Sequence, residues 1–290
     1  MDAIVCEQLT KFYGTRVGIE NVSFSVGEGQ ICGFLGPNGA GKSTTLRLLA
    51  GLMKPTTGTS RVLGMNAWNQ RESIMSDVGY LPGEVRVWNW MTANDALSFL
   101  NRVHACELAS SWRRMTDLFE LNPDVRVRNM SKGMRQKLGL IMALVHNPRV
   151  LIFDEPTSGL DPVMQERLLS ELRTRASNGS AILFSSHSLK EVEHLCDRVV
   201  MVRRGALIED TSIKSLSEQA VRQVRIQFPR EPVTSFENAL WAQKGLEWKG
   251  TIQGDSKHVA AWALSQDASD LVIESPDLEH LFQSRYRDEP

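Results

Sequence analysis

The sequence lacks the features that mark several classes of protein. Its four cysteines are far apart and form no Cys-X-X-Cys pair, which argues against a zinc ribbon or a disulfide framework and favours a reducing compartment. The longest apolar stretch, residues 138–145, is much shorter than the roughly 20 residues that span a bilayer. Asp2 and Glu7 stand where a signal peptide would carry basic residues. We therefore expect a cytoplasmic protein that does not cross a membrane by itself.

An excess of charge of either sign is also missing. The chain has 33 lysines and arginines against 34 aspartates and glutamates, so it offers no overall attraction to nucleic acid or anionic lipid. We expect no nucleic-acid partner. The composition, 42% hydrophobic and 23% charged, is that of a globular protein, and 290 residues are enough for about two domains.

Short apolar runs and helical patterns alternate over residues 1–214. Residues 31–35, 150–153 and 181–185 are apolar throughout, which is typical of strands buried on both faces. This alternation predicts an α/β fold with a mostly parallel core sheet covered on both faces. The helical patterns between about residues 85 and 148, with Thr92 and Asp95 as a capping box, predict a helical insert.

The pattern changes after about residue 214, and residues 215–290 are predicted to form a small α+β extension. We expect short strands at residues 221–228, 246–253, 258–264 and 271–274. Ser275-Pro276-Asp277 predicts the start of a last helix.

A glycine-rich segment follows the first apolar run and precedes a predicted helix. Residues 36–43 fit the phosphate-binding pattern of glycine, four residues, glycine, lysine and serine, in the expected position between strand and helix. Backbone N–H groups of such a loop bind phosphate, Lys42 reaches the β- and γ-phosphates, and the Ser43 hydroxyl is a ligand for Mg²⁺. The predicted nucleotide-binding residues of the loop are Gly36, Pro37, Asn38, Gly39, Ala40, Gly41, Lys42, Ser43 and Thr44.

Two adjacent carboxylates end a second apolar run. Asp154 and Glu155 follow residues 150–153, and ligands bind at the carboxyl ends of parallel strands, so we expect both side chains in the same crevice as the phosphate loop. Asp154 is predicted to hold Mg²⁺. Glu155 is predicted to orient or deprotonate the attacking water.

These motifs together resemble those of the ATP-binding-cassette (ABC) ATPases, the nucleotide-binding subunits of ABC transporters. Residues 130–137 are similar to the family's Leu-Ser-Gly-Gly-Gln signature: Ser131 and Gly133 match, whereas Lys132 and Met134 depart. The resemblance implies an ABC-type P-loop NTPase fold, in which antiparallel strands flank the mostly parallel core sheet and a helical insert is present. It also implies an ATP-closed homodimer, in which Ser131 and Gly133 of one copy complete the ATP site of the other.

Three further positions follow the order of the family. Residues 158–161 resemble the loop that crosses the dimer seam, which implies a nucleotide-site role for Asp161. His187 follows two serines and resembles the histidine that contacts the γ-phosphate. Tyr13 occupies the place of the aromatic residue that stacks on adenine, although a tyrosine there also suits ordinary packing.

One position departs from the family. Residues 79–84 have Gly83 where the family usually has a glutamine that ligates Mg²⁺. Either Glu84 takes over this contact or water fills the coordination position, because Mg²⁺ readily retains water. We favour water.

The C-terminal residues 274–282, together with residues 130–134 and 80–84, are similar to those of ABC-2 type exporters of drugs, antibiotics, polysaccharides or lipids. The resemblance implies an ATP hydrolase that uses ATP and Mg²⁺ and powers a separate transmembrane permease from the inner face of the membrane. Val87, Trp88 and Trp90 are candidates for the permease contact and equally for packing of the helical insert. An importer ATPase and a non-transport regulatory module remain as alternatives.

Overall fold

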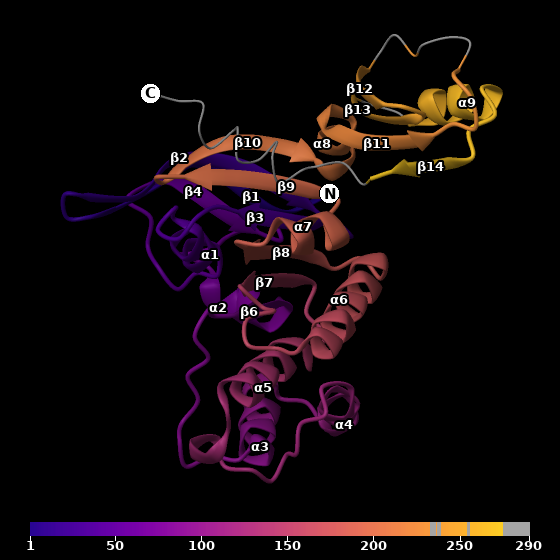
Figure 1. Ribbon diagram of the computed structural model, residues 1–290. Helices are drawn as coiled ribbons and strands as arrows, with labels where there is room; N and C mark the ends of the chain where they lie inside the picture. The colour runs from indigo at the N-terminus through magenta and orange to yellow at the C-terminus, as the bar shows by residue number, and fades with distance from the viewer. Residues whose placement is uncertain (233–235, 237–238, 254–255, 275–290) are drawn as a thin grey trace. The chain divides into compact units, whose positions relative to one another are not determined.

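The computed structural model describes residues 1–232, 236, 239–253 and 256–274 (Figure 1). The chain divides into two compact units, Met1–Asp210 and Thr211–Pro290, and each is described by itself. The predicted helix that starts at Ser275 lies outside the described residues.

The core of the first unit is a six-stranded sheet in the order β10-β9-β3-β8-β7-β6. The pairs β3–β8, β3–β9, β7–β8 and β6–β7 are parallel, which confirms the predicted mostly parallel sheet. Every residue of β3, β7 and β8 is buried, as expected for apolar strands covered on both faces. The strands are β3 (Ile31–Leu35), β6 (Val78–Leu81), β7 (Val150–Asp154), β8 (Ala181–Ser186), β9 (Arg198–Arg203) and β10 (Ala206–Ser212).

A second sheet, in the order β2-β1-β4-β5, is antiparallel and shares its core with the first. Helix α1 (Lys42–Leu49) contacts strands of both sheets. Leu9 of β1, Phe34 of β3 and Leu46 of α1 belong to one buried cluster, so the phosphate loop before α1 starts from a rigid base. The strands are β1 (Asp2–Tyr13), β2 (Arg16–Gly27), β4 (Thr57–Val62) and β5 (Met65–Asn66).

The predicted helical insert is present, and α3, α4 and α5 gather away from β1, β2 and β4 in Figure 1. Thr92 and Asp95 form the expected capping box at the start of α3, and Ser131 caps α5. Arg114 of α4 donates two hydrogen bonds, of 3.0 and 2.9 Å, to the buried Glu171 of α6, which ties the insert to the core. The helices are α2 (Arg71–Ile74), α3 (Ala93–His104), α4 (Ala109–Leu118), α5 (Lys132–Leu144), α6 (Pro162–Ser177) and α7 (Leu189–Leu195), with short 3-10 turns η1 (Met75–Asp77) and η2 (Val127–Asn129).

The second unit has an antiparallel sheet in the order β12-β13-β11-β14 and two described helices. The predicted strand at residues 258–264 is wrong, because this segment lies within helix α9. Val259 and Ala263, four residues apart, are its buried residues and pack with Trp248 of β13. The elements are α8 (Ile213–Gln219), β11 (Val221–Gln227), β12 (Leu240–Lys244), β13 (Glu247–Gln253), α9 (Lys257–Ser265) and β14 (Asp270–Ile273).

A half-buried histidine, His146, which follows α5 in the chain, makes the stability of the first unit pH-dependent. The His146 ring stacks on His104 at a centroid distance of 4.3 Å, and its Nε2 lies 3.3 Å from the carbonyl of Val78. Burial, and then the nearby charge of His104, lower the pKa of His146 to about 4. Because the unfolded state binds a proton at higher pH than the folded state, stability is present above pH 6.5 and falls as the pH drops towards 4.

We predict that His146→Gln flattens this dependence, since glutamine keeps a donor for Val78 and cannot take up a proton. Between pH 6.5 and about 4, the wild type should lose about 1 kcal/mol or more relative to the variant. This difference corresponds to about 2–4 °C in melting temperature, measurable by calorimetry. Parallel melting curves over that range would contradict the assignment.

Candidate functional site

The phosphate loop between β3 and α1 is open to an anion. Gly41 precedes α1 with φ of 104° and a side chain there would lie 2.5 Å from Ile19, so only glycine fits. The first turn of α1 carries no acidic residue and no side-chain cap, which leaves its N–H groups and positive helix end available for phosphate.

Lys42 is the cation of this loop. Its side chain is 6% exposed, and its Nζ donates to the carbonyl of Gly36 at 2.6 Å. Burial lowers the pKa of Lys42, and the negative charges of Glu155 and Asp154 oppose this shift. The ammonium is therefore partly desolvated beside carboxylates, in the place where a phosphate would enter.

The carboxylate of Glu155 lies close to the side chains of both Lys42 and His187. Its Oε1 lies 3.8 Å from Lys42 Nζ and 3.3 Å from Nδ1 of His187. Glu155 also has a φ of 50°, a left-handed conformation that costs a non-glycine residue about 1–2 kcal/mol. Lys42, Glu155 and His187, which are predicted to contact the γ-phosphate or the attacking water and to support catalysis, thus lie together at one end of the parallel sheet.

The residues predicted for magnesium have suitable chemistry. Asp154 is 4% exposed, and of its two carboxylate oxygens Oδ1 accepts a hydrogen bond from Ser185. A side chain at Gly83 would lie 3.2 Å from Oδ2, so the missing glutamine leaves space at that oxygen. Among the described residues no three His, Cys, Asp or Glu side chains form a metal cluster. Mg²⁺ keeps water and needs only one or two protein ligands, and Asp154 and Ser43 carry oxygen atoms that could serve as such ligands.

A cavity of about 540 Å³ lies over the loop. Tyr13 lines its rim, 44% exposed, with its hydroxyl 3.3 Å from Thr44 Oγ1. A half-exposed ring at this rim is available for stacking on a base. Glu155 lines the cavity, together with the predicted nucleotide-binding residues Tyr13, Pro37, Asn38, Gly39, Gly41, Lys42, Ser43 and Thr44.

The residues predicted from the signature and from the seam loop are not part of this cavity. Ser131 accepts the N–H of Met134 at 3.2 Å as the cap of α5, and Asp161 caps α6. A side chain on Gly133 would meet the carbonyl of Gly159 at 2.7 Å, so the two segments abut. Within one chain, the signature and the phosphate loop do not form a single site.

Two buried polar residues next to the carboxylates were not predicted from the sequence. Ser185 contacts Asp154 and Glu155, and Gln136 of α5 donates to the carbonyl of Pro156 at 3.0 Å. A polar residue that ends an apolar run two positions before His187 was the available signal for Ser185. Gln136 lies within residues 130–137, which resemble the signature, but nothing in that segment indicates its contact with Pro156, 20 positions further along the chain.

The comparisons with known proteins agree with this geometry. Residues 19–158 match the ABC transporter family. Over 218 residues the chain is 38% identical to the uncharacterised ABC transporter ATP-binding protein YxlF of Bacillus subtilis, covering 73% of this chain and 72% of that protein. The chain belongs to the ABC transporter ATP-binding proteins.

Two further likenesses support the assignment. The bacitracin transport ATP-binding protein BcrA of Bacillus licheniformis is 32% identical over 222 residues, 76% of this chain and 72% of that protein. A solved structure of an ATP-binding subunit of an ABC transporter is 27% identical with a TM-score of 0.69, covering 74% of this chain and 91% of that one. The ABC-type α/β fold is thereby confirmed, and the protein is an ATP-binding ATP hydrolase.

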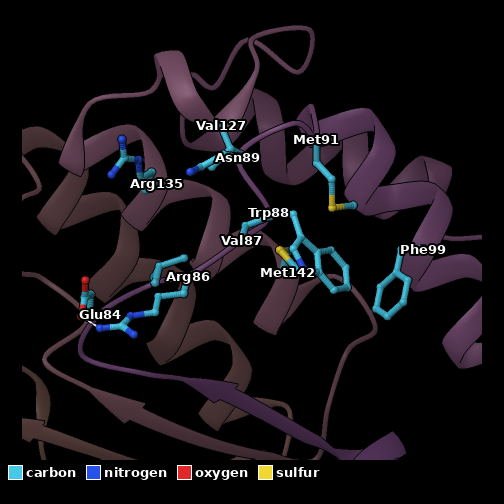
Figure 2. A pocket seen from close by; sticks show the side chains of 11 residues that line it. Glu84, Arg86, Val87, Trp88, Asn89, Met91, Phe99, Val127, Arg135 and Met142 are labelled. Carbon is cyan, nitrogen blue, oxygen red and sulfur yellow. Dashed lines mark hydrogen bonds and ion pairs between the residues drawn. The ribbon is translucent and has the colours of Figure 1, made fainter.

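The position of the Glu84 side chain supports water, and not the Glu84 carboxylate, as the magnesium ligand in place of the missing glutamine. Glu84 is 74% exposed and makes an ion pair of 2.7 Å with Arg86, at the edge of a neighbouring groove (Figure 2). We predict that Glu84→Ala leaves the Mg²⁺ dependence of ATP hydrolysis unchanged, within about 0.5 kcal/mol, as for other surface substitutions. Asp154→Asn is the comparison variant and should need much more Mg²⁺ for half-maximal activity. If Glu84→Ala also needed more Mg²⁺ for half-maximal activity, the Glu84 carboxylate would be a ligand of the metal.

Proposed function

We propose that this protein is the ATP-hydrolysing subunit of an ABC-2 type exporter and works as a homodimer on the inner face of a membrane. In this assignment residues 1–214 are the nucleotide-binding domain, with the helical insert at about 85–148, and residues 215–290 are an extension. Support for transport comes from the relative named for bacitracin transport. None of the helices among the described residues is long and apolar enough to span a bilayer.

The observation that carries the dimer is the division of the predicted site within one chain. The cavity over the loop is lined by residues of segments 13–18 and 37–47 and by Glu155, and by none of residues 131–133, which are all described. Ser131 is exposed at the start of α5, where free N–H groups suit an anion. A second copy would bring this helix start to the nucleotide and close the site.

The proposed reaction is attack of water on the γ-phosphorus of ATP. Glu155 accepts a proton from the water, the new oxygen–phosphorus bond forms, and the bond from the γ-phosphorus to the bridging oxygen breaks to leave ADP. In this reaction Lys42 exchanges its contact with Glu155 for a contact with the γ-phosphate. Lys42 and His187 then stabilise negative charge on that phosphate. Bound Mg²⁺ would neutralise charge on the β- and γ-oxygens.

Release of phosphate is the proposed origin of movement. The γ-phosphate is the charge that would join Lys42 of one copy to the helix start at Ser131 of the other. Once it leaves, nothing of equal charge bridges the copies, so the closed dimer is favoured by ATP and the open one by ADP.

The groove beside the magnesium site is the proposed contact for the permease. It has a volume of about 520 Å³ and runs from Glu84 to Phe99, with Arg135 of α5 and Val127 on its wall (Figure 2). Trp88 is 59% exposed and meets Phe99 edge to face at 6.0 Å. Exposed aromatic side chains beside charged ones are typical of interaction sites, and Arg135 joins this groove to the signature helix.

The first test is Glu155→Gln with ATP and Mg²⁺. Removal of the general base should lower hydrolysis at least about 100-fold while nucleotide binding persists, so the variant should accumulate as an ATP-bound dimer. Light scattering with ATP and with ADP measures directly whether the variant is a dimer. Ser131→Arg in the same background is the control that should prevent closure without touching the chain's own loop. A monomer at saturating ATP, or full activity of Glu155→Gln, would contradict the proposed function.

The second test concerns the groove. Trp88→Ala should keep ATP hydrolysis of the isolated subunit and weaken binding to its permease by about 2 kcal/mol, as for a central aromatic contact. Trp68→Ala is the matched control, since Trp68 is half-buried against Arg71 and does not line the groove. Co-purification with a permease and transport in vesicles measure the effect. The direction of transport in the vesicles also distinguishes an exporter from an importer. If both variants bound the permease equally well, Trp88 would only pack within the helical insert and would not contact the permease.

A further inference from the structure

The penultimate residue of strand β8, Ser185, has a buried hydroxyl that contacts both carboxylate residues of the site. Ser185 Oγ donates to Asp154 Oδ1 at 2.6 Å, and the same oxygen accepts the backbone N–H of Glu155 at 3.1 Å. Ser185 has no exposed surface, so bulk water does not compete for either bond. A single hydroxyl therefore contacts the predicted magnesium ligand and the predicted general base together.

The backbone of Glu155 needs such support. Its φ of 50° is unfavourable for a side chain with a Cβ, and it persists only where neighbouring groups hold it. The N–H of Glu155 is held by the carbonyl and the hydroxyl of Ser185, at 3.2 and 3.1 Å. Its carbonyl accepts from the N–H of Ser158 at 3.1 Å and from Gln136 Nε2 at 3.4 Å. Among these groups, the Ser185 hydroxyl is the side chain that holds the N–H of Glu155.

The geometry points to Ser185 as a positioning residue for ATP hydrolysis, which orients Asp154 towards magnesium and Glu155 towards the attacking water. This inference rests on the proposed roles of the two carboxylates. It adds that their relative orientation depends on one hydroxyl supplied by the neighbouring strand. The β7–β8 register, which pairs Asp154 with Ser185, places the hydroxyl there.

Only a hydroxyl performs both parts of this contact, because it donates one hydrogen bond and accepts another. Threonine retains that chemistry, whereas valine has the same shape without it. The adjacent Ser186 does not share the role, since its hydroxyl donates to Glu191 at 2.6 Å. The requirement is therefore for a hydroxyl at position 185 in particular.

The test compares Ser185→Thr with Ser185→Val, two variants of equal shape that differ in the hydroxyl. Ser185→Val should lower kcat about 10- to 100-fold and raise the Mg²⁺ concentration for half-maximal activity, as loss of a group that orients a ligand does. The KM for ATP should change little, because the phosphate loop is intact. Ser185→Thr should restore both values. Ser180→Ala is the control: it removes another buried hydroxyl, which donates to Pro148 at the opposite end of β8, and should match the wild type.

A measurement without metal or nucleotide tests the same contact. Hydrogen exchange of the Glu155 amide in the free protein should be at least about tenfold faster in Ser185→Val than in Ser185→Thr, because one of its two acceptors is lost. Amides of β3 serve as the internal reference and should be unchanged. Faster exchange throughout β3, β7 and β8 would indicate general loosening and would overturn the positioning role.

Each outcome separates this inference from the proposed function. If Glu155→Gln stays active, the assignment of the catalytic carboxylate is wrong, whatever Ser185 does. If Glu155→Gln is inactive but Ser185→Val has normal kcat, Mg²⁺ dependence and Glu155 exchange, the carboxylate assignment stands and the role of Ser185 is overturned. Equal losses in Ser185→Thr and Ser185→Val would also overturn it, since shape and not the hydroxyl would then matter.

Discussion

The parallel register of three central strands is the constraint on which the site depends. β3, β7 and β8 run in the same direction, Asp154 pairs with Ser185, and Leu35 pairs with Ser186. The phosphate loop, the two carboxylates and His187 must therefore leave the sheet at the same edge. Because all three strands are buried on both faces, a shift in register would disrupt the close packing of their side chains on either face, and this holds the polar groups in place.

Contacts at this edge are mutually dependent. Glu155 lies between Lys42 and His187, and its left-handed backbone is held by Ser185 on one side and by Ser158 and Gln136 on the other. Gln136 belongs to the helix whose start is the signature segment. That helix also lines the groove proposed for the permease, through Arg135. A movement of α5 would thus reach Glu155, the proposed general base, through its backbone and not through its side chain.

Patterns that depend on neighbours in the chain were predictable. The apolar runs of β3, β7 and β8 and the capping box at Thr92 were expected from the residues and are present. The segment 258–264 was mistaken for a strand because short apolar stretches suit either structure, and packing of Val259 and Ala263 against the unit's own sheet decides for a helix. Strand β12 was missed, and pairing with β13 stabilises it.

The sequence by itself determined the chemistry of the site: a loop that binds phosphate, a lysine beside it and a carboxylate pair after a buried run, since each is a property of consecutive residues. Tertiary structure decided which groups touch. It paired Glu84 with Arg86, placed His187 and Lys42 beside one oxygen of Glu155, and set the hydroxyl of Ser185 between the Asp154 carboxylate and the backbone N–H of Glu155. These contacts join residues up to 113 positions apart (42 to 155), and only the packing and register of the sheet bring such distant groups within hydrogen-bonding or ionic range.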